Sequence, residues 1–206
     1  MKTISGLARL AALGVLLALT GCVTTAENSL SQNDIAGMKL TGVTVGFVPD
    51  AQVQWEDGIR AYATSKAIPD DEIATATNTP EGKAYVLTML APVIRTGVTK
   101  SLNGKLNGTR PVRLDVVVKT FALSSAVQRI LIGGGRGMIA DARLVDARTG
   151  AVIIANPDLT AVLYAGQGIV GTAVQAAIDS ASDKNVVQKL VDRYGESHRD
   201  WLLRRA

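Results

Sequence analysis

The amino-acid sequence predicts an α+β fold, with a small, mainly antiparallel sheet and two long helices packed on one face. Three observations predict it. Apolar and polar residues alternate in the middle of the chain, apolar residues three or four apart mark helices before and after, and Asp and Gly mark a tight turn between strands. Hairpin-forming strands accompanied by two amphipathic helices are typical of a sheet covered on one face.

The first elements are a strand and a long helix. Residues 43–48 are rich in β-branched side chains and predict the first strand. Over 50–78 the only pattern is a short helix at 55–62. Thr79–Glu81 then has the composition of a helix start, and Pro92 predicts a kink further along that helix. Its apolar stripe consists of Leu87, Leu90, Ile94, Val98 and Leu102.

The later elements are strands followed by a helix. Residues 112–119 and 138–147 alternate in polarity, as half-buried strands do. The turn Asp146–Gly150 predicts that the following apolar residues pair back as a hairpin. An apolar stripe over 170–194 predicts the last helix, which we expect to end at Gly195 because glycine commonly terminates helices.

The beginning of the chain has the features of an export signal. The basic residues Lys2 and Arg9 accompany Leu10–Leu19, an apolar stretch of ten residues. A transmembrane helix needs roughly 20 such residues, so this stretch fits a signal peptide better. It ends in Leu19-Thr20-Gly21-Cys22, which resembles the lipobox of bacterial lipoproteins. The resemblance implies cleavage before Cys22 and acylation of its sulfur and new amine, and two or more acyl chains anchor a protein stably.

We therefore divide the chain into a signal peptide (1–21), a flexible polar tether (22–40) and a single α+β domain (41–206). Val23 stands where an Asp typically retains lipoproteins in the inner membrane, so we expect lipid anchoring at the periplasmic face of the outer membrane. The alternative is an ordinary secretory signal with an incidental cysteine.

Composition argues against several function classes. Lys2 and Arg9 lie in the signal, so of 22 basic and 18 acidic residues the mature chain keeps 20 and 18, which is too balanced to indicate nucleic-acid binding. Cys22 is the only cysteine and His198 the only histidine. Without a second histidine or a free cysteine, the sequence excludes zinc sites and cysteine nucleophiles, so we expect no metal, no cofactor and no catalytic residues.

The most distinctive segment of the mature chain consists of Gly133, Gly134, Gly135, Arg136 and Gly137. A phosphate-binding loop usually has a helix start behind it, whereas a strand follows here. We interpret the segment as a connection between strands. The alternative is a partner-binding loop with Arg136 at its tip.

The C-terminal residues offer a second candidate surface. Four arginines surround Trp201, so this end of the last helix is basic and amphipathic. Such an end is suited to contact with a membrane surface or a partner. The alternative is that Trp201 packs on the protein's own sheet. We expect His198, nearby, to be a hydrated residue of the terminal helix.

The segment Gly133–Gly150 resembles part of a class of uncharacterised proteobacterial lipoproteins, in which a glycine-rich loop precedes a strand ending in an Asp-Ala-x-Thr-Gly turn. Those proteins are loosely similar to the N-terminal α/β domain of the Tol-system translocation protein and to the curli-secretion lipoprotein. The resemblance implies an envelope-associated α+β module rather than an enzyme. The amphipathic hairpins with which curli-secretion proteins form pores have no counterpart in this sequence.

We therefore expect a non-enzymatic lipoprotein that contacts the bilayer through acylated Cys22 and binds an envelope protein partner or supports envelope assembly. The first alternative is a periplasmic carrier of a small hydrophobic or lipid ligand, which needs an apolar cavity between sheet and helices. The second is an enzyme.

Overall fold

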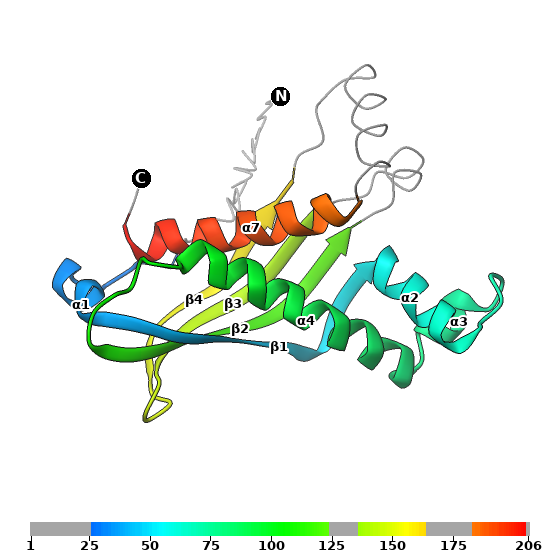
Figure 1. The fold of residues 1–206 in the computed structure, drawn as a ribbon, viewed down its shortest axis with the longest axis horizontal. Coiled ribbons are helices and arrows are strands. Elements are labelled where there is room, and N and C mark those ends of the chain that lie inside the picture. Colours follow the sequence, from blue (N-terminus) through cyan, green and yellow to red (C-terminus); the bar gives the residue numbers. More distant parts are fainter. Residues whose placement is uncertain (1–25, 124–135, 164–182, 205–206) are drawn as a thin grey trace, which may run out of the picture.

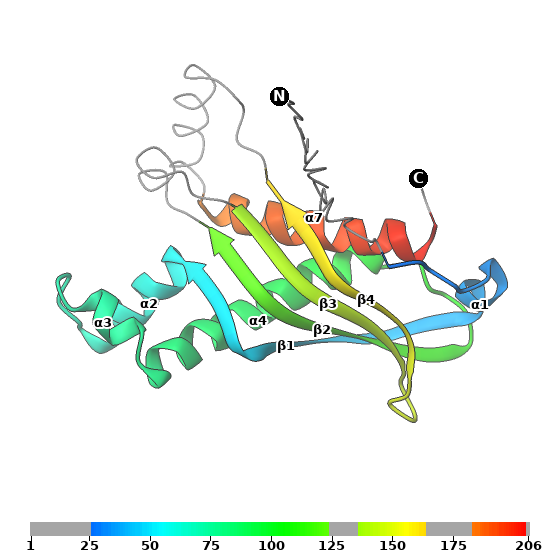
Figure 2. The ribbon, with the colours of Figure 1, turned by 180° about the vertical axis from the view of Figure 1, so that it is seen from behind.

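The computed structural model describes residues 26–123, 136–163 and 183–204. Within them, four strands form one sheet in the order β1-β2-β3-β4. Two long helices, α4 and α7, lie side by side across one face of it (Figure 1). The opposite face carries no helix in the described parts of the chain (Figure 2). The strands are β1 (Met38–Trp55), β2 (Arg110–Leu123), β3 (Arg136–Asp146) and β4 (Val152–Val162).

The predicted α+β class is confirmed, and the structure refines its details. The sheet is mixed: β1 pairs with β2 in parallel, and only the β2–β3 and β3–β4 pairs are antiparallel. The parallel pair arises because the chain crosses over through helices between β1 and β2. Within residues 26–123, 136–163 and 183–204, the two long helices are accompanied by three short ones. The helices are α1 (Gln32–Gly37), α2 (Glu56–Lys66), α3 (Ile73–Thr77), α4 (Pro80–Leu102) and α7 (Asp183–Leu202).

The core lies between the sheet and the α4–α7 layer. Helix α4 begins as expected, with the Thr79 hydroxyl accepting a hydrogen bond from the amide of Gly82 at 3.1 Å. Its stripe faces the sheet, except that Leu87 is only half-buried. The largest side chains with no exposed surface come from both layers: Tyr194, Phe121, Met38, Leu90, Ile94, Leu114, Met138, Leu144 and Leu190.

Two glycines bring α4 and α7 into close contact. A β-carbon on Gly97 of α4 would collide with the side chain of Val191, and one on Gly195 of α7 would collide with Ser101. The expectation that α7 ends at Gly195 is therefore wrong, because α7 continues to Leu202. Gly195 is a packing residue, and its missing side chain lets the helices approach.

The residues predicted as a tether are largely folded. Residues 32–37 form α1, which begins with a reciprocal capping box between Ser31 and Asp34, and β1 starts at Met38. Asn28 is buried against the end of α7. The prediction of a flexible segment over 22–40 is therefore wrong from residue 26 onward, because local capping and contacts with α7 fix it.

Several expectations fall outside the described residues. These are the signal peptide, Cys22, the glycines 133–135 and the first part of the predicted apolar stripe, residues 170–181. No helix that the structure describes combines the length and apolar character needed to cross a membrane.

Candidate binding groove

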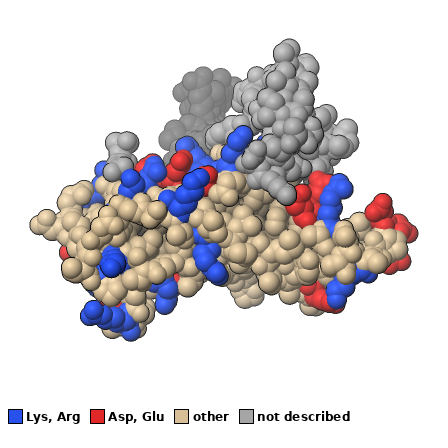
Figure 3. Space-filling view, in the orientation of Figure 1, with Lys and Arg blue, Asp and Glu red and all other residues tan. Residues whose placement is uncertain are grey.

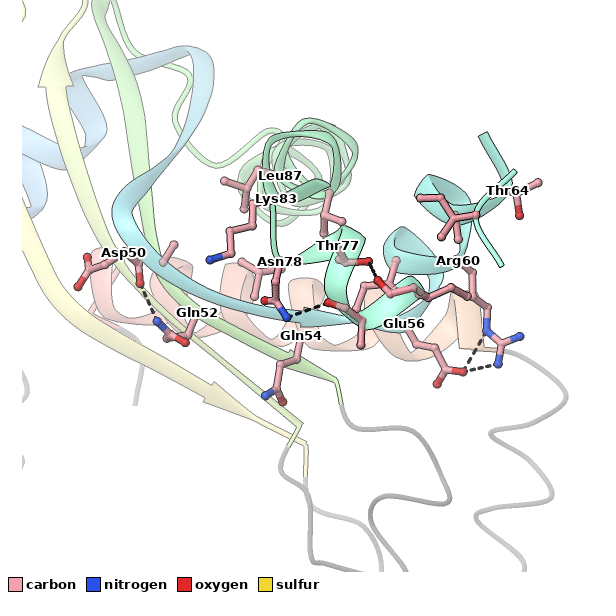
Figure 4. A pocket seen from close by; sticks show the side chains of 18 of the residues that line it. Asp50, Gln52, Gln54, Glu56, Arg60, Thr64, Thr77, Asn78, Lys83 and Leu87 are labelled. Carbon is pink, nitrogen blue, oxygen red and sulfur yellow. Dashed lines mark hydrogen bonds and ion pairs between the residues drawn. The ribbon is translucent and has the colours of Figure 1, made fainter. Parts of the chain in front are cut away.

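A groove of about 1450 Å³ lies beside the C-terminal part of β1 (Figure 4). Helices α2 and α3 and the beginning of α4 form its other walls. Seven consecutive residues of β1, 48–54, line it. Because successive side chains of a strand point to opposite faces, an unbroken run of lining residues means that the edge of the strand borders the groove.

A large bulge places β1 at this groove. Phe47 pairs with Val118 and Gln52 with Thr120, so four residues of β1 stand opposite the single residue Lys119. Pro49 lies within the bulge and has no amide hydrogen to donate, which suits it to an edge strand. The bulge bends β1 (Figure 2), and residues 52–55 then pair with β2 again.

Glycine contacts fix the walls of the groove. A β-carbon on Gly58 of α2 would lie 2.6 Å from Cε3 of Trp55, so α2 packs directly on the buried indole at the end of β1. A β-carbon on Gly82 of α4 would lie 2.8 Å from the Cα of Thr77, so α3 packs on the first turn of α4. Neither wall has room for a larger residue at these contacts.

The groove combines apolar and charged groups. Val53, Ile59 and Leu87 supply apolar surface. Arg60 is engaged with Glu56 in an ion pair of 2.5 Å. The ammonium of Lys83 extends from α4 into the space beside β1 (Figure 4) and makes no hydrogen bond or ion pair within the described residues. Its charge is therefore available to a bound molecule.

The structure does not support Arg136 as the tip of an exposed loop. Arg136 is the first residue of β3, is 7% exposed and pairs with Leu123 of β2. Its carbonyl accepts a hydrogen bond from the amide of Leu163 at 2.9 Å. Gly137 also lies in β3, with its α-carbon facing β4. Both residues therefore belong to the sheet, because strand pairing continues further than the glycines suggest.

The expectation for His198 is also wrong. Its side chain has no exposed surface and packs against Trp201, with ring centroids 5.6 Å apart. Burial lowers the pKa of His198 to about 4, so the imidazole is neutral at pH 7. Neither ring nitrogen has a hydrogen-bond partner among the described residues. A helical position near the C-terminus looked exposed in sequence, but it faces the sheet.

Asp141 and Asp146 of β3 each interact with separate partners. Asp141 is on the helix-free face of the sheet, where it contacts Lys119 at 2.7 Å and Arg143 at 3.3 Å. Asp146 accepts hydrogen bonds from turn amides, at 3.1 Å from that of Arg148. No group of three or more potential metal-binding side chains occurs in the parts of the chain that the structure describes.

The interior leaves little room for a ligand between sheet and helices. The side chains that face each other across this layer, such as Leu90, Leu144 and Tyr194, are fully buried. The Tyr194 hydroxyl donates a hydrogen bond to the carbonyl of Ala140 at 3.2 Å, so this buried polar group has a partner within the layer. This packing argues against carriage of a hydrophobic ligand in that layer.

The fold and site define an α+β protein with a groove at the edge of its sheet. The chain belongs to a family of unknown function, DUF6778, whose sequence profile matches residues 80–202, from the first residue of α4 to the last of α7. Most of the groove, formed by β1, α2 and α3, lies outside that match. No curated protein sequence matches the chain.

Among solved structures, one similar chain is described as a candidate lipoprotein from Caulobacter crescentus CB15. It has 14% identity and a TM-score of 0.32, over 55% of this chain and 80% of that one. A second is a dodecamer of a single-residue variant of PelC from Paraburkholderia phytofirmans, at 11% identity and a TM-score of 0.34, over 84% and 94%. Another crystal form of the PelC dodecamer has 13% identity and a TM-score of 0.28, over 84% of this chain and 93% of that one.

Proposed function

We propose that this protein is a lipid-anchored lipoprotein of the bacterial outer membrane that binds another envelope protein, without catalysing a reaction. The lipobox ending at Cys22 supports the anchor. The observation that carries the binding function is the edge of β1, which borders an open groove over seven consecutive residues.

A strand edge beside a groove suits an extended segment of a partner protein. The edge offers backbone amides and carbonyls, and an added strand satisfies them while its alternate side chains enter neighbouring pockets. Pro49 and the bulge leave residues 52–54 as the regular stretch of this edge. We therefore propose that the partner pairs there, with apolar side chains against Ile59 and Leu87 and an acidic group near Lys83.

The anchor is tested by comparing the natural chain with Cys22→Ser in a Gram-negative host. Radiolabelled palmitate is expected in the natural chain only, and it should fractionate with the outer membrane. The variant is expected in the soluble periplasmic fraction or as an uncleaved precursor. Equal membrane association of both chains, or an unlabelled natural chain, would contradict lipid anchoring.

The groove is tested by crosslinking in cells. A photoreactive amino acid at Gln54, which is exposed in the groove, is expected to give a discrete adduct with one envelope protein. The same group at the exposed Asn33 of α1 serves as the control and should give none.

Charge reversal then tests the role of Lys83. Lys83→Glu should abolish the Gln54 adduct, whereas Lys105→Glu, a matched change at an exposed lysine outside the groove, should leave it intact. An adduct that survives Lys83→Glu would contradict the role of Lys83 in binding the partner.

A further inference from the structure

The N-terminal segment is clamped to the end of α7. The Asn28 side chain donates hydrogen bonds to the carbonyls of Trp201 and Leu202 at 3.0 and 2.9 Å. In return, the Trp201 indole donates to the carbonyl of Ala26, and Arg204 donates to that of Asn28, each at 2.5 Å. These bonds fix the chain at residue 26 rather than near residue 40.

The clamp makes the membrane connection short. Only four residue steps separate Cys22 from Ala26, and four extended residues span at most about 14 Å. A tether that remained free as far as residue 40 would reach roughly 60 Å. An acylated Cys22 therefore holds the end of α7 within one short segment of the bilayer surface.

The end of the molecule that carries the clamp is also the more basic of its two ends. The end that carries the clamp comprises residues 26–39, 100–110 and 192–204, with seven basic and five acidic side chains, a net charge of +2. The opposite end, residues 50–83, has three basic and seven acidic side chains, a net charge of −4. Figure 3 shows separate blue side chains on a mostly tan surface at the first end, and the red side chains gathered toward the other.

We propose that the anchored protein stands on the membrane in one orientation, with the end formed by α1 and the C-terminus of α7 against anionic lipid headgroups. This inference rests on the proposed acylation of Cys22. Basic side chains near an anionic surface are attracted to it, while the acidic end is repelled. Trp201, half-buried beside the clamp, lies at the same end and suits the headgroup region.

The orientation determines where the groove points. Figure 1 shows α1 and the C-terminal end of α7 at one end of the long axis and α2 and α3 at the other. Because α2 and α3 wall the groove, the groove then faces the periplasm, away from the membrane. A partner would reach it without competing with lipid.

The test uses the acylated protein in vesicles of phosphatidylethanolamine and phosphatidylglycerol that contain nitroxide-labelled lipid. Acylation consumes the only native thiol, so an introduced cysteine takes up a fluorophore alone. Gln32→Cys labels the clamped end and Asp71→Cys the acidic end, and both positions are exposed. The label at residue 32 is expected to be quenched severalfold more than the label at residue 71.

A spacer provides the matched control. Twelve Gly and Ser residues inserted between Cys22 and Ala26 leave the clamp intact but lengthen the connection, and should reduce the difference between the two labels. Equal quenching of both labels in vesicle-bound protein would overturn the orientation. Labelling of Cys22 itself, or failure to bind vesicles, would instead refute the anchor on which the inference depends.

Discussion

Gly195 of α7 lies so close to Ser101 of α4 that a β-carbon on the glycine would come within 2.8 Å of the Ser101 Cβ. Overpacking a core contact costs about 1–3 kcal/mol, and alanine recovers about 1 kcal/mol of helix propensity. We expect Gly195→Ala to lower the free energy of unfolding by about 1 kcal/mol, as measured by urea titration.

Gly46→Ala is the control for this change, because nothing lies within 4 Å of a β-carbon at Gly46. It should leave stability unchanged or slightly raised, since glycine is unfavourable within a strand. If Gly195→Ala were as stable as the natural chain, the two helices would be further apart than the structure shows.

His198 makes stability depend on pH. An unfolded chain takes up the imidazole proton as pH falls through about 6.5, whereas the folded chain resists until about pH 4. The unfolded state therefore binds more protons between these values, and stability falls as pH falls. From pH 7 to pH 5 the loss attributable to His198 should be about 2 kcal/mol.

The contribution of His198 is isolated by the variant His198→Leu. Because no hydrogen bond of the imidazole is lost within the described residues, the variant should be at least as stable at pH 7. Its unfolding free energy should vary less between pH 7 and pH 5. Parallel pH profiles for the two proteins would show that the imidazole is hydrated.

Periodicity predicted the elements that build the core. The alternation over 112–119 and the stripe Leu90, Ile94, Val98 reflect burial on one side only, and the structure places both in the sheet–helix interface. The direction of β1 was not predictable in this way, because parallel pairing depends on where the chain crosses, which no local pattern records.

The groove was missed for a related reason. Most of its walls come from residues 50–78, where the chain follows a strand edge and two short helices and buries few side chains, so no period develops. Pro49, next to a β-branched run, was the available signal of an edge strand. Glycine is common at helix ends, so the sequence favoured the end of α7 at Gly195. In the structure Gly195 lies within α7, because the close contact with α4 leaves no room for a side chain there.

Asp141 organises the helix-free face of the sheet. It accepts a hydrogen bond from the amide of Asp158 at 3.0 Å and pairs with Lys119. Burial raises the pKa of Asp141, but these bonds outweigh it, so the pKa lies below its usual value. The stability they provide is present above about pH 4 and is lost as pH falls below that value.

Two substitutions separate the charge of Asp141 from its acceptor role. Asp141→Ala should destabilise the protein by about 1–2 kcal/mol near pH 7, and Asp141→Asn by less, because the amide oxygen still accepts from Asp158. The exposed Asp71→Ala is the control. Thermal unfolding at pH 7 and pH 3 measures the stability of the variants relative to the natural chain. If Asp141→Ala destabilised the protein equally at both pH values, the charge of Asp141 would not contribute to stability.

Asn28 closes α7 by donating to two of its last carbonyls, which have no partner within the helix. Asn28→Ala removes the side-chain donor from the Leu202 carbonyl and leaves the Trp201 carbonyl with only the amide of Arg204 at 3.3 Å, so it should cost about 1–3 kcal/mol, since Asn28 is 7% exposed. Ser29→Ala, next to it and exposed, should change stability by less than about 0.5 kcal/mol. Hydrogen exchange locates the effect: the last turn of α7 and residues 28–31 should lose protection together, while the amides of β2 and β3 keep theirs. Loss of protection in α7 alone would mean that the N-terminal segment is held by something other than this clamp.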